Sequence, residues 1–228
     1  EFELDAYPVE LRNSIKDTVN ALNNIKSIRR GVDNFSVKVG DVLGYYTNTI
    51  SKLINNIVVI SNISNNYEII RSLTAFVSFI NAKENAGQER AVLSNTFSAD
   101  KFGDGIYNKF IALVVAQNLY IEEFKKYVDP EELINYNNIT SGNKDFQEVE
   151  RMRAVAMENA FTGGFETSGT YWFATITKKI DILKQIEDRL AARLIKDIDQ
   201  IRQSNIDVLV FSIGILAFAF IATFGFSY

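Results

Sequence analysis

Apolar residues recur at helical spacing along most of the chain, and no stretch of useful length alternates as a β-strand would. The spacing predicts helices over about 8–30, 36–61, 72–97, 106–128 and 145–160, separated by runs of turn-forming residues. A short helix is expected after Asp129-Pro130, where an acidic cap precedes a proline, with a loop over 135–144. A long amphipathic helix should begin near residue 170. The pattern indicates an all-α fold of antiparallel helical bundles.

The long final helix is predicted to continue into the hydrophobic end of the chain. About 19 uncharged residues, 208–226, follow Asp207, and at 1.5 Å per residue they just span a hydrocarbon core of roughly 30 Å. A fully buried core helix is the alternative, but such a helix normally shows a polar face. We therefore expect a helical domain over 1–203 and a transmembrane helix over 204–228. Representative residues of the span are Val208, Phe211, Leu216, Phe220 and Phe226.

Polar residues interrupt the apolar stripe of the helix predicted over 72–97. Steps of three and four residues lead from the apolar start of the helix through Lys83, Glu84, Gly87, Arg90 and Ser94 to Phe97. A buried charge costs several kcal/mol unless it is paired, and a glycine in mid-helix costs roughly 1 kcal/mol. The pattern leaves two interpretations open. One is an internal ion pair, in which Glu84 neutralises Lys83 or Arg90, and the other is a site for a small anion.

Composition excludes several classes of function. The 228 residues include no cysteine and no histidine, so the chain lacks thiol chemistry, the commonest metal ligand and the commonest general base. No glycine-rich phosphate loop follows a predicted strand, and no nucleophile motif is present. We therefore expect neither an enzyme nor a cofactor. The net charge of −4 also argues against a nucleic-acid partner.

The segment AKENAGQERAVLSNTFSADKF resembles the signature of the NIT domain, in the form found in the ectodomains of bacterial methyl-accepting chemoreceptors. IRRGVDN, GDVLGYYTNTISKLINNI and NKFIALVVAQNLYIEEF resemble further blocks of that domain. TYWFATITKKIDILKQIEDRL resembles the stretch that leads into the second transmembrane helix of such receptors. The resemblance implies packed helical bundles and the sensing of nitrate or nitrite.

The resemblance also implies that Arg90, at the arginine of the family's AGxERA motif, contacts the anion. A guanidinium offers planar, forked donors that match planar nitrate. Gly87, one turn earlier, would let the ligand or a facing helix come close, and Lys83 would add positive field. Gln88 and Ser94 are candidate neutral donors, whereas Glu84 and Glu89 are better suited to positioning cations.

The chain departs from the family pattern at its start. The family begins with a further helix whose Arg-Gly motif carries a second arginine, and this helix is expected to be missing here. Arg30-Gly31 resembles that motif, but the block that follows has the spacing of a later segment. Arg29 and Arg30 are therefore either ligand groups or charges at a helix C-terminus. Arg151 and Arg153 are expected on a solvated face, and Trp172 in packing.

The resemblance implies the sensory domain of a membrane-anchored nitrate or nitrite chemoreceptor. The helical domain would lie in the periplasm, the last helix would cross the bacterial inner membrane, and the chain would pair as a homodimer or with a partner subunit. Signal transduction would pass along the helix of residues 170–226 to a part that this sequence lacks. The alternative is a sensor-derived structural or assembly subunit that is anchored in the membrane and binds no ligand.

Overall fold

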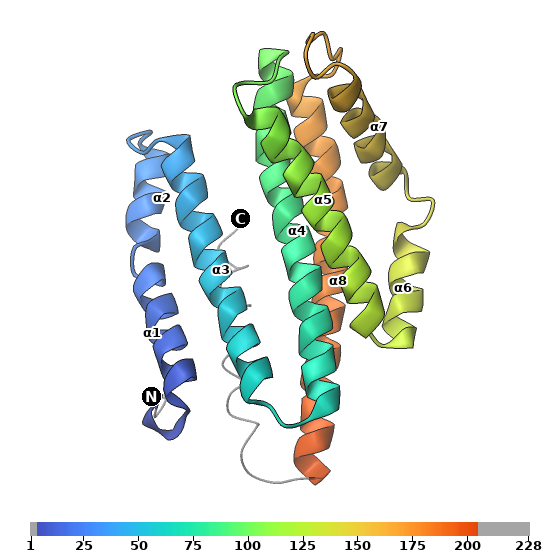
Figure 1. Ribbon diagram of the computed structural model, residues 1–228. Coiled ribbons are helices and arrows are strands. Elements are labelled where there is room, and N and C mark those ends of the chain that lie inside the picture. Colours follow the sequence, from blue (N-terminus) through green and yellow to red (C-terminus); the bar gives the residue numbers. More distant parts are fainter. Residues whose placement is uncertain (1–3, 205–228) are drawn as a thin grey trace. The chain divides into compact units, whose positions relative to one another are not determined.

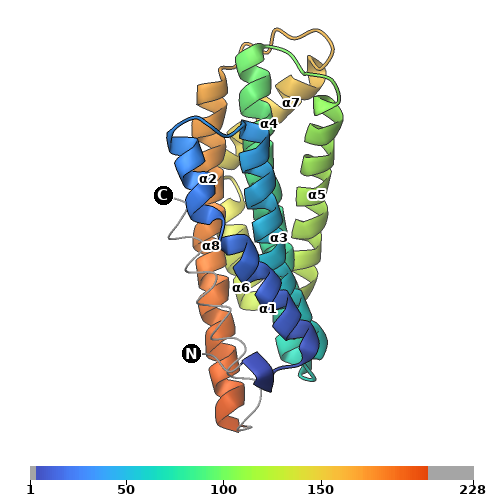
Figure 2. The ribbon, with the colours of Figure 1, turned by 90° about the vertical axis from the view of Figure 1, so that its left-hand side faces the viewer.

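The computed structural model describes residues 4–204, and helices are the only regular elements in that part of the chain (Figures 1 and 2). In chain order they are η1 (Leu4–Ala6), α1 (Val9–Leu22), α2 (Ile25–Asp33), α3 (Val39–Ile63), α4 (Tyr67–Ala99), α5 (Ile106–Tyr127), α6 (Pro130–Thr140), α7 (Lys144–Glu158) and α8 (Gly169–Ser204). The predicted all-α, helical-bundle fold is confirmed. Six of the predicted helices, α3 to α8, also begin within a few residues of their expected positions.

The first helix was predicted wrongly as one element. The structure has two helices, because α1 ends at Leu22 and α2 begins at Ile25. Between them Asn23 and Asn24 keep near-helical backbone angles, and the Asn24 N–H bonds to the Ala21 carbonyl, 3.3 Å away. The apolar spacing continues across this irregularity, so the spacing alone does not reveal it.

The loop predicted over 135–144 was also wrong in its first half, because α6 continues to Thr140. Its predicted start is confirmed: the Asp129 carboxylate accepts a hydrogen bond from the N–H of Glu131, 2.9 Å away. Tyr136 explains the extra length, since it is 8% exposed and lies edge-on to Phe124, with 5.4 Å between ring centroids. Packing thus overrides the turn preference of the neighbouring asparagines.

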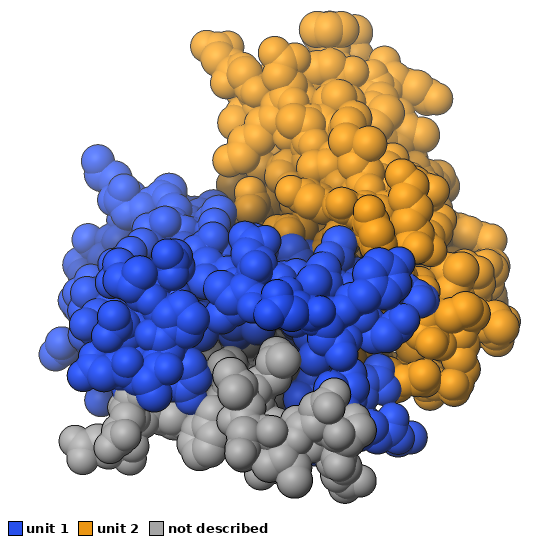
Figure 3. Space-filling view, turned by 60° about the horizontal axis from the view of Figure 1, so that its bottom comes forward, with its two compact units in different colours: residues 1–77, 194–228 blue, residues 78–193 orange. Residues whose placement is uncertain are grey.

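The chain divides into two compact units (Figure 3). Unit 1 comprises residues 1–77 and 194–228, of which 4–77 and 194–204 are described, and unit 2 comprises residues 78–193. In unit 1, α1 packs along α3 through polar as well as apolar contacts. The Ser14 hydroxyl donates to the Asn56 side-chain oxygen at 2.6 Å, and the Tyr45 hydroxyl donates to the Ala21 carbonyl at 2.8 Å.

Unit 2 has a well-packed apolar core around Trp172, which is fully buried as predicted. The Trp172 indole N–H donates to the backbone carbonyl of Arg90 at 3.0 Å, so the aromatic ring ties the first turns of α8 to α4. The buried residues of this core are Leu93, Phe97, Phe110, Val114, Val149, Met152, Ala156, Phe165, Trp172 and Ile176.

The predicted long helix begins at Gly169, close to the expected position, and α8 is described as far as Ser204. The predicted transmembrane residues Val208, Phe211, Leu216, Phe220 and Phe226 lie outside the described residues. Among residues 4–204, no helix combines the length and the apolar character needed to cross a bilayer.

Candidate functional site

Arg90 lies on α4 within unit 2, with its side chain half-buried against α8. Its guanidinium donates to the Thr177 hydroxyl at 3.0 Å and lies over the Phe173 ring, 4.8 Å from the centroid. Stacking on an aromatic face is a favourable environment for a guanidinium. The predicted ligand residue is therefore positioned by two side chains of α8.

Lys83 is buried and forms an ion pair with Glu187 of α8. The ion-pair interpretation of the sequence is thus realised across a helix interface, with a carboxylate that the sequence pattern did not single out. Burial lowers the pKa of Lys83 and raises the pKa of Glu187, and the charge of each opposes the shift of the other. Because Glu187 already neutralises much of its charge, Lys83 supplies less field to a nearby anion than the sequence suggested.

The remaining predicted site residues share one stretch of α4. The Gln88 amide donates to the Glu84 carboxylate at 3.1 Å, and the Ser94 hydroxyl donates to the Arg90 carbonyl at 2.6 Å. At Gly87 a β-carbon would meet no atom within 4 Å, so there is open space beside this residue. Gly87 and Arg90 are three residues apart and share one face of the helix.

A buried charge network lies on the neighbouring face of α4. Glu89 is fully buried, and its carboxylate accepts two hydrogen bonds from the guanidinium of Arg153 on α7, at 2.7 and 2.5 Å. Gln117 of α5 donates to Glu89 at 2.8 Å and accepts from Arg153 at 2.8 Å. Burial lowers the pKa of Arg153, but Glu89 and then Glu150 outweigh this effect, so the net shift is upward. The expectation that Glu89 positions a cation is confirmed.

The prediction that both arginines of α7 lie on a solvated face is wrong for Arg153. Arg151 is exposed and pairs with Glu148 at 2.7 Å, whereas the Arg153 side chain is 3% exposed. A signal for this difference was present in the sequence, because Arg153 falls on the apolar stripe of α7. The buried members of that stripe are Val149, Met152, Arg153 and Ala156.

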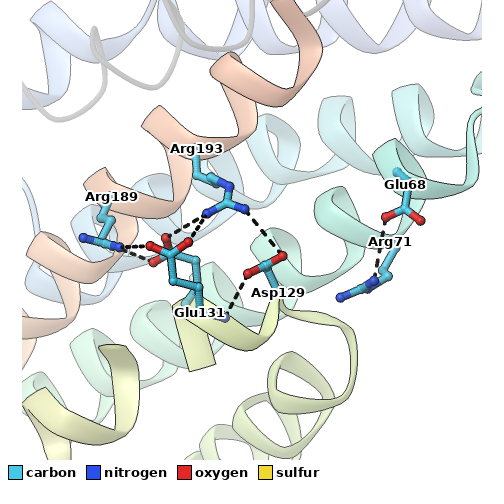
Figure 4. Close-up of polar contacts among 7 residues, drawn as sticks. Glu68, Arg71, Asp129, Glu131, Arg189 and Arg193 are labelled. Atoms are coloured by element: carbon cyan, nitrogen blue, oxygen red, sulfur yellow. Dashed lines mark hydrogen bonds and ion pairs between the residues drawn. The ribbon is translucent and has the colours of Figure 1, made fainter. Parts of the chain in front are cut away.

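A third polar cluster joins the start of α6 to α8 within unit 2 (Figure 4). Arg189 donates to the buried carboxylate of Glu132 at 2.7 Å and lies 3.3 Å from Glu131. Arg193 lies 3.0 Å from Glu131 and 3.5 Å from Asp129. These charged contacts hold α8 near residue 193, where unit 2 ends. Trp172 holds α8 near its first turn.

Two known proteins resemble this chain, one in sequence and one in fold. The "Nitrate regulatory protein" of Klebsiella oxytoca is 21% identical over 184 residues, which cover 81% of this chain and 46% of that protein. The solved structure of the NasR transcription antiterminator matches with a TM-score of 0.77 at 19% identity, covering 93% of this chain and 60% of that one. These names describe regulation rather than an enzymatic reaction.

The chain therefore spans about half the length of the curated relative that it matches. The family model for "Nitrate and nitrite sensing" matches residues 1–195, which is most of the sequence and all of unit 2. On this evidence the chain belongs to the nitrate and nitrite sensing (NIT) family.

Proposed function

We propose that this domain binds nitrate or nitrite and that Arg90 is the residue that contacts the anion. The observation that carries the proposal is the combination of a half-buried guanidinium and open space at Gly87 on the same face of α4. A planar monoanion can accept two parallel hydrogen bonds from such a group. Membership of the NIT family supports the choice of anion.

In this proposal Arg90 donates the hydrogen bonds to the anion, and Gly87 leaves space for it. Lys83, Gln88 and Ser94 are proposed to lie around the anion, although each already has a partner within unit 2. To bind an anion directly, each of them would have to exchange that partner for the ligand. Their role in the proposal is therefore to shape and tune the site around Arg90.

The signal is proposed to pass from α4 to α8. An anion that takes hydrogen bonds from Arg90 competes with the Thr177 hydroxyl and so changes the balance between two packings of α8 on α4. Such a ligand shifts the balance only by the difference between its affinities for the two packings. The receptor form of this proposal, a homodimer in the bacterial inner membrane with a periplasmic sensor, depends on the hydrophobic stretch 208–226.

The rival proposal is a structural or assembly module that keeps the fold without a ligand. The ion pair of Lys83 favours this alternative, because it gives one of the conspicuous charges of α4 a purely structural explanation. The two proposals differ in whether nitrate or nitrite stabilises the folded chain.

A titration of the full chain with sodium nitrate and sodium nitrite, against sodium chloride at equal ionic strength, separates them. A ligand at 100 times its Kd stabilises the folded state by about 2.7 kcal/mol, which thermal unfolding readily detects. Arg90→Lys keeps the charge but loses the forked donors, so its stabilisation by nitrate should fall while the fold persists. Arg151→Lys, on the exposed face of α7, is the matched control. If nitrate and nitrite stabilise the wild-type chain no more than chloride does, the structural alternative is correct.

A further inference from the structure

Unit 2 contains a cavity of about 260 Å³ that the proposed nitrate site does not use. Its walls combine aromatic and aliphatic side chains with amides and five charged side chains. The residues that matter here are Gln117, Asn118, Tyr136, Phe146, Leu183 and Lys179. Ligand pockets usually measure about 300–1,000 Å³, so this cavity suits a small molecule or an ion.

Lys179 is the unusual member of the lining. It is 7% exposed, and its ammonium lies over the Phe146 ring, 5.4 Å from the centroid. Within residues 4–204 it has neither a hydrogen bond nor an ion pair of its own. Lys178 shows the ordinary behaviour: it is 65% exposed and lies 3.8 Å from Asp145. A buried ammonium without a partner is costly to a fold, so its place at a cavity calls for an explanation.

The neighbouring charges leave this ammonium poorly compensated. Arg153 lies on the same cavity wall and uses its guanidinium on Glu89 and Glu150. The Glu150 side chain is 61% exposed, so water screens its attraction for Lys179. The other charged residues of the lining, Glu122 and Lys125, pair with each other at 2.8 Å.

The pKa of Lys179 reflects the same imbalance. Burial is the largest cause of its fall to about 8, and the positive charge of Arg153 adds to the fall. Glu89 and Glu150 oppose it only in part. An anion in the cavity would supply the missing partner and raise the pKa of Lys179 again.

We infer that this cavity binds a small monovalent oxyanion, with the ammonium of Lys179 as its charge partner. The shared chemistry fits nitrate itself or the carboxylate of a small organic acid, whose apolar part would contact Phe146 and Leu183. A single poorly compensated cation argues for one negative charge rather than two. The inference stands independently of the role of Arg90.

The geometry of α8 separates this cavity from the proposed nitrate site. Arg90 contacts Thr177, and Lys179 follows two residues later, which is about 200° around the helix axis. The two residues therefore project from nearly opposite faces of α8. Ligand binding at the cavity can be tested without altering Arg90.

The experiment follows the side-chain NMR signals of lysine in the full chain, labelled with ¹³C-lysine, at pH 7.5. Sodium acetate, sodium propionate and sodium nitrate are titrated against sodium chloride at constant ionic strength. The Lys179 signal should shift saturably, and its pKa should rise above about 8 in the presence of the bound anion. Calorimetry of Lys179→Met should show an affinity at least about tenfold weaker, because the variant lacks a charged hydrogen bond. Lys178→Met should bind as the wild type does.

The arms of the titration identify the ligand class and separate the two sites. Tighter binding of propionate than of nitrate indicates an organic carboxylate, and the reverse order indicates an inorganic oxyanion. The Lys179 response should persist in Arg90→Lys, whatever that variant does to the stabilisation by nitrate. The inference is overturned if Lys179 gives no saturable response to any of the three anions, if Lys179→Met binds as the wild type does, or if Arg90→Lys abolishes the response.

Discussion

Replacing Arg153 with methionine should destabilise unit 2 strongly, because Glu89 would keep its burial and lose its cation. Glu89 is fully buried and Arg153 is 3% exposed, and breaking such a pair by removing one partner typically costs about 3–5 kcal/mol. Gln117 would remain as one donor to the carboxylate, 2.8 Å away, which offsets part of the loss. We expect a loss of about 3 kcal/mol at pH 7.

A proton can neutralise the buried carboxylate in place of the lost arginine. The free energy of that protonation is therefore an upper limit on the destabilisation caused by the lost charge. Protonating a glutamate side chain, whose pKa in water is about 4.3, costs about 3.7 kcal/mol at pH 7 and about 1 kcal/mol at pH 5. The destabilisation caused by Arg153→Met should therefore shrink by more than half between pH 7 and pH 5. Loss of packing alone would produce no such dependence on pH.

Urea unfolding, followed by the fluorescence of Trp172, measures the free energy of unfolding of unit 2. Trp172 is the single tryptophan of the chain and lies in the core of unit 2. With a slope of about 2 kcal/mol per molar urea, the midpoint should fall by about 1.5 M at pH 7. Arg151→Met, which removes an exposed arginine from the same helix, should cost at most about 1 kcal/mol. Equal losses in the two variants, or a loss at pH 5 as large as at pH 7, would refute the reasoning.

Three further variants test other parts of the structure. Gly87→Ala should stabilise the ligand-free chain by up to about 1 kcal/mol in thermal unfolding, because the added methyl meets no atom. The same variant should weaken the stabilisation by nitrate if the anion lies beside Arg90. Gly169→Ala should cost about 1–3 kcal/mol in urea unfolding, since a β-carbon there would lie 2.5 Å from the Ser94 carbonyl oxygen, and no loss would contradict that close approach. The free energy of unfolding should rise between about pH 8 and pH 10.5 in the wild type, because Lys179 loses its proton at a lower pH in the folded state than in the unfolded state. Lys179→Met should lack this part of the rise.

Most of the fold could be predicted from the sequence, because each helix carries its own periodic signal. Helix α5 shows this most simply: apolar spacing and a preceding break gave residues 106–128, and the structure has Ile106–Tyr127. The errors occur where a distant contact decides the local structure. The local sequence at the asparagine-rich end of α6 predicts a loop. Tyr136 packs on Phe124, however, and this contact keeps the segment helical.

The candidate site could be predicted only in part, for a similar reason. The sequence identified Arg90 as a charge on an apolar face, yet its partner Thr177 lies 87 residues further along the chain. It identified Lys83 as a charge in need of a partner, but gave no basis for choosing Glu187. Periodicity locates a residue on one face of its own helix, and the facing residue depends on the rotation and register of another helix.

The contacts between α4 and α8 change in character along unit 2, and this bears on how a bound anion could act. Near the start of α8, Trp172 packs in an apolar core that tolerates little displacement. Further along, Thr177 and Arg90 make a polar contact that is only half-buried. Polar partners can be exchanged for an anion or for water at a smaller cost than opening a packed core. On the proposed mechanism, the segment of α8 beyond Trp172 is therefore the part whose packing the anion changes, while the aromatic core serves as its fixed support.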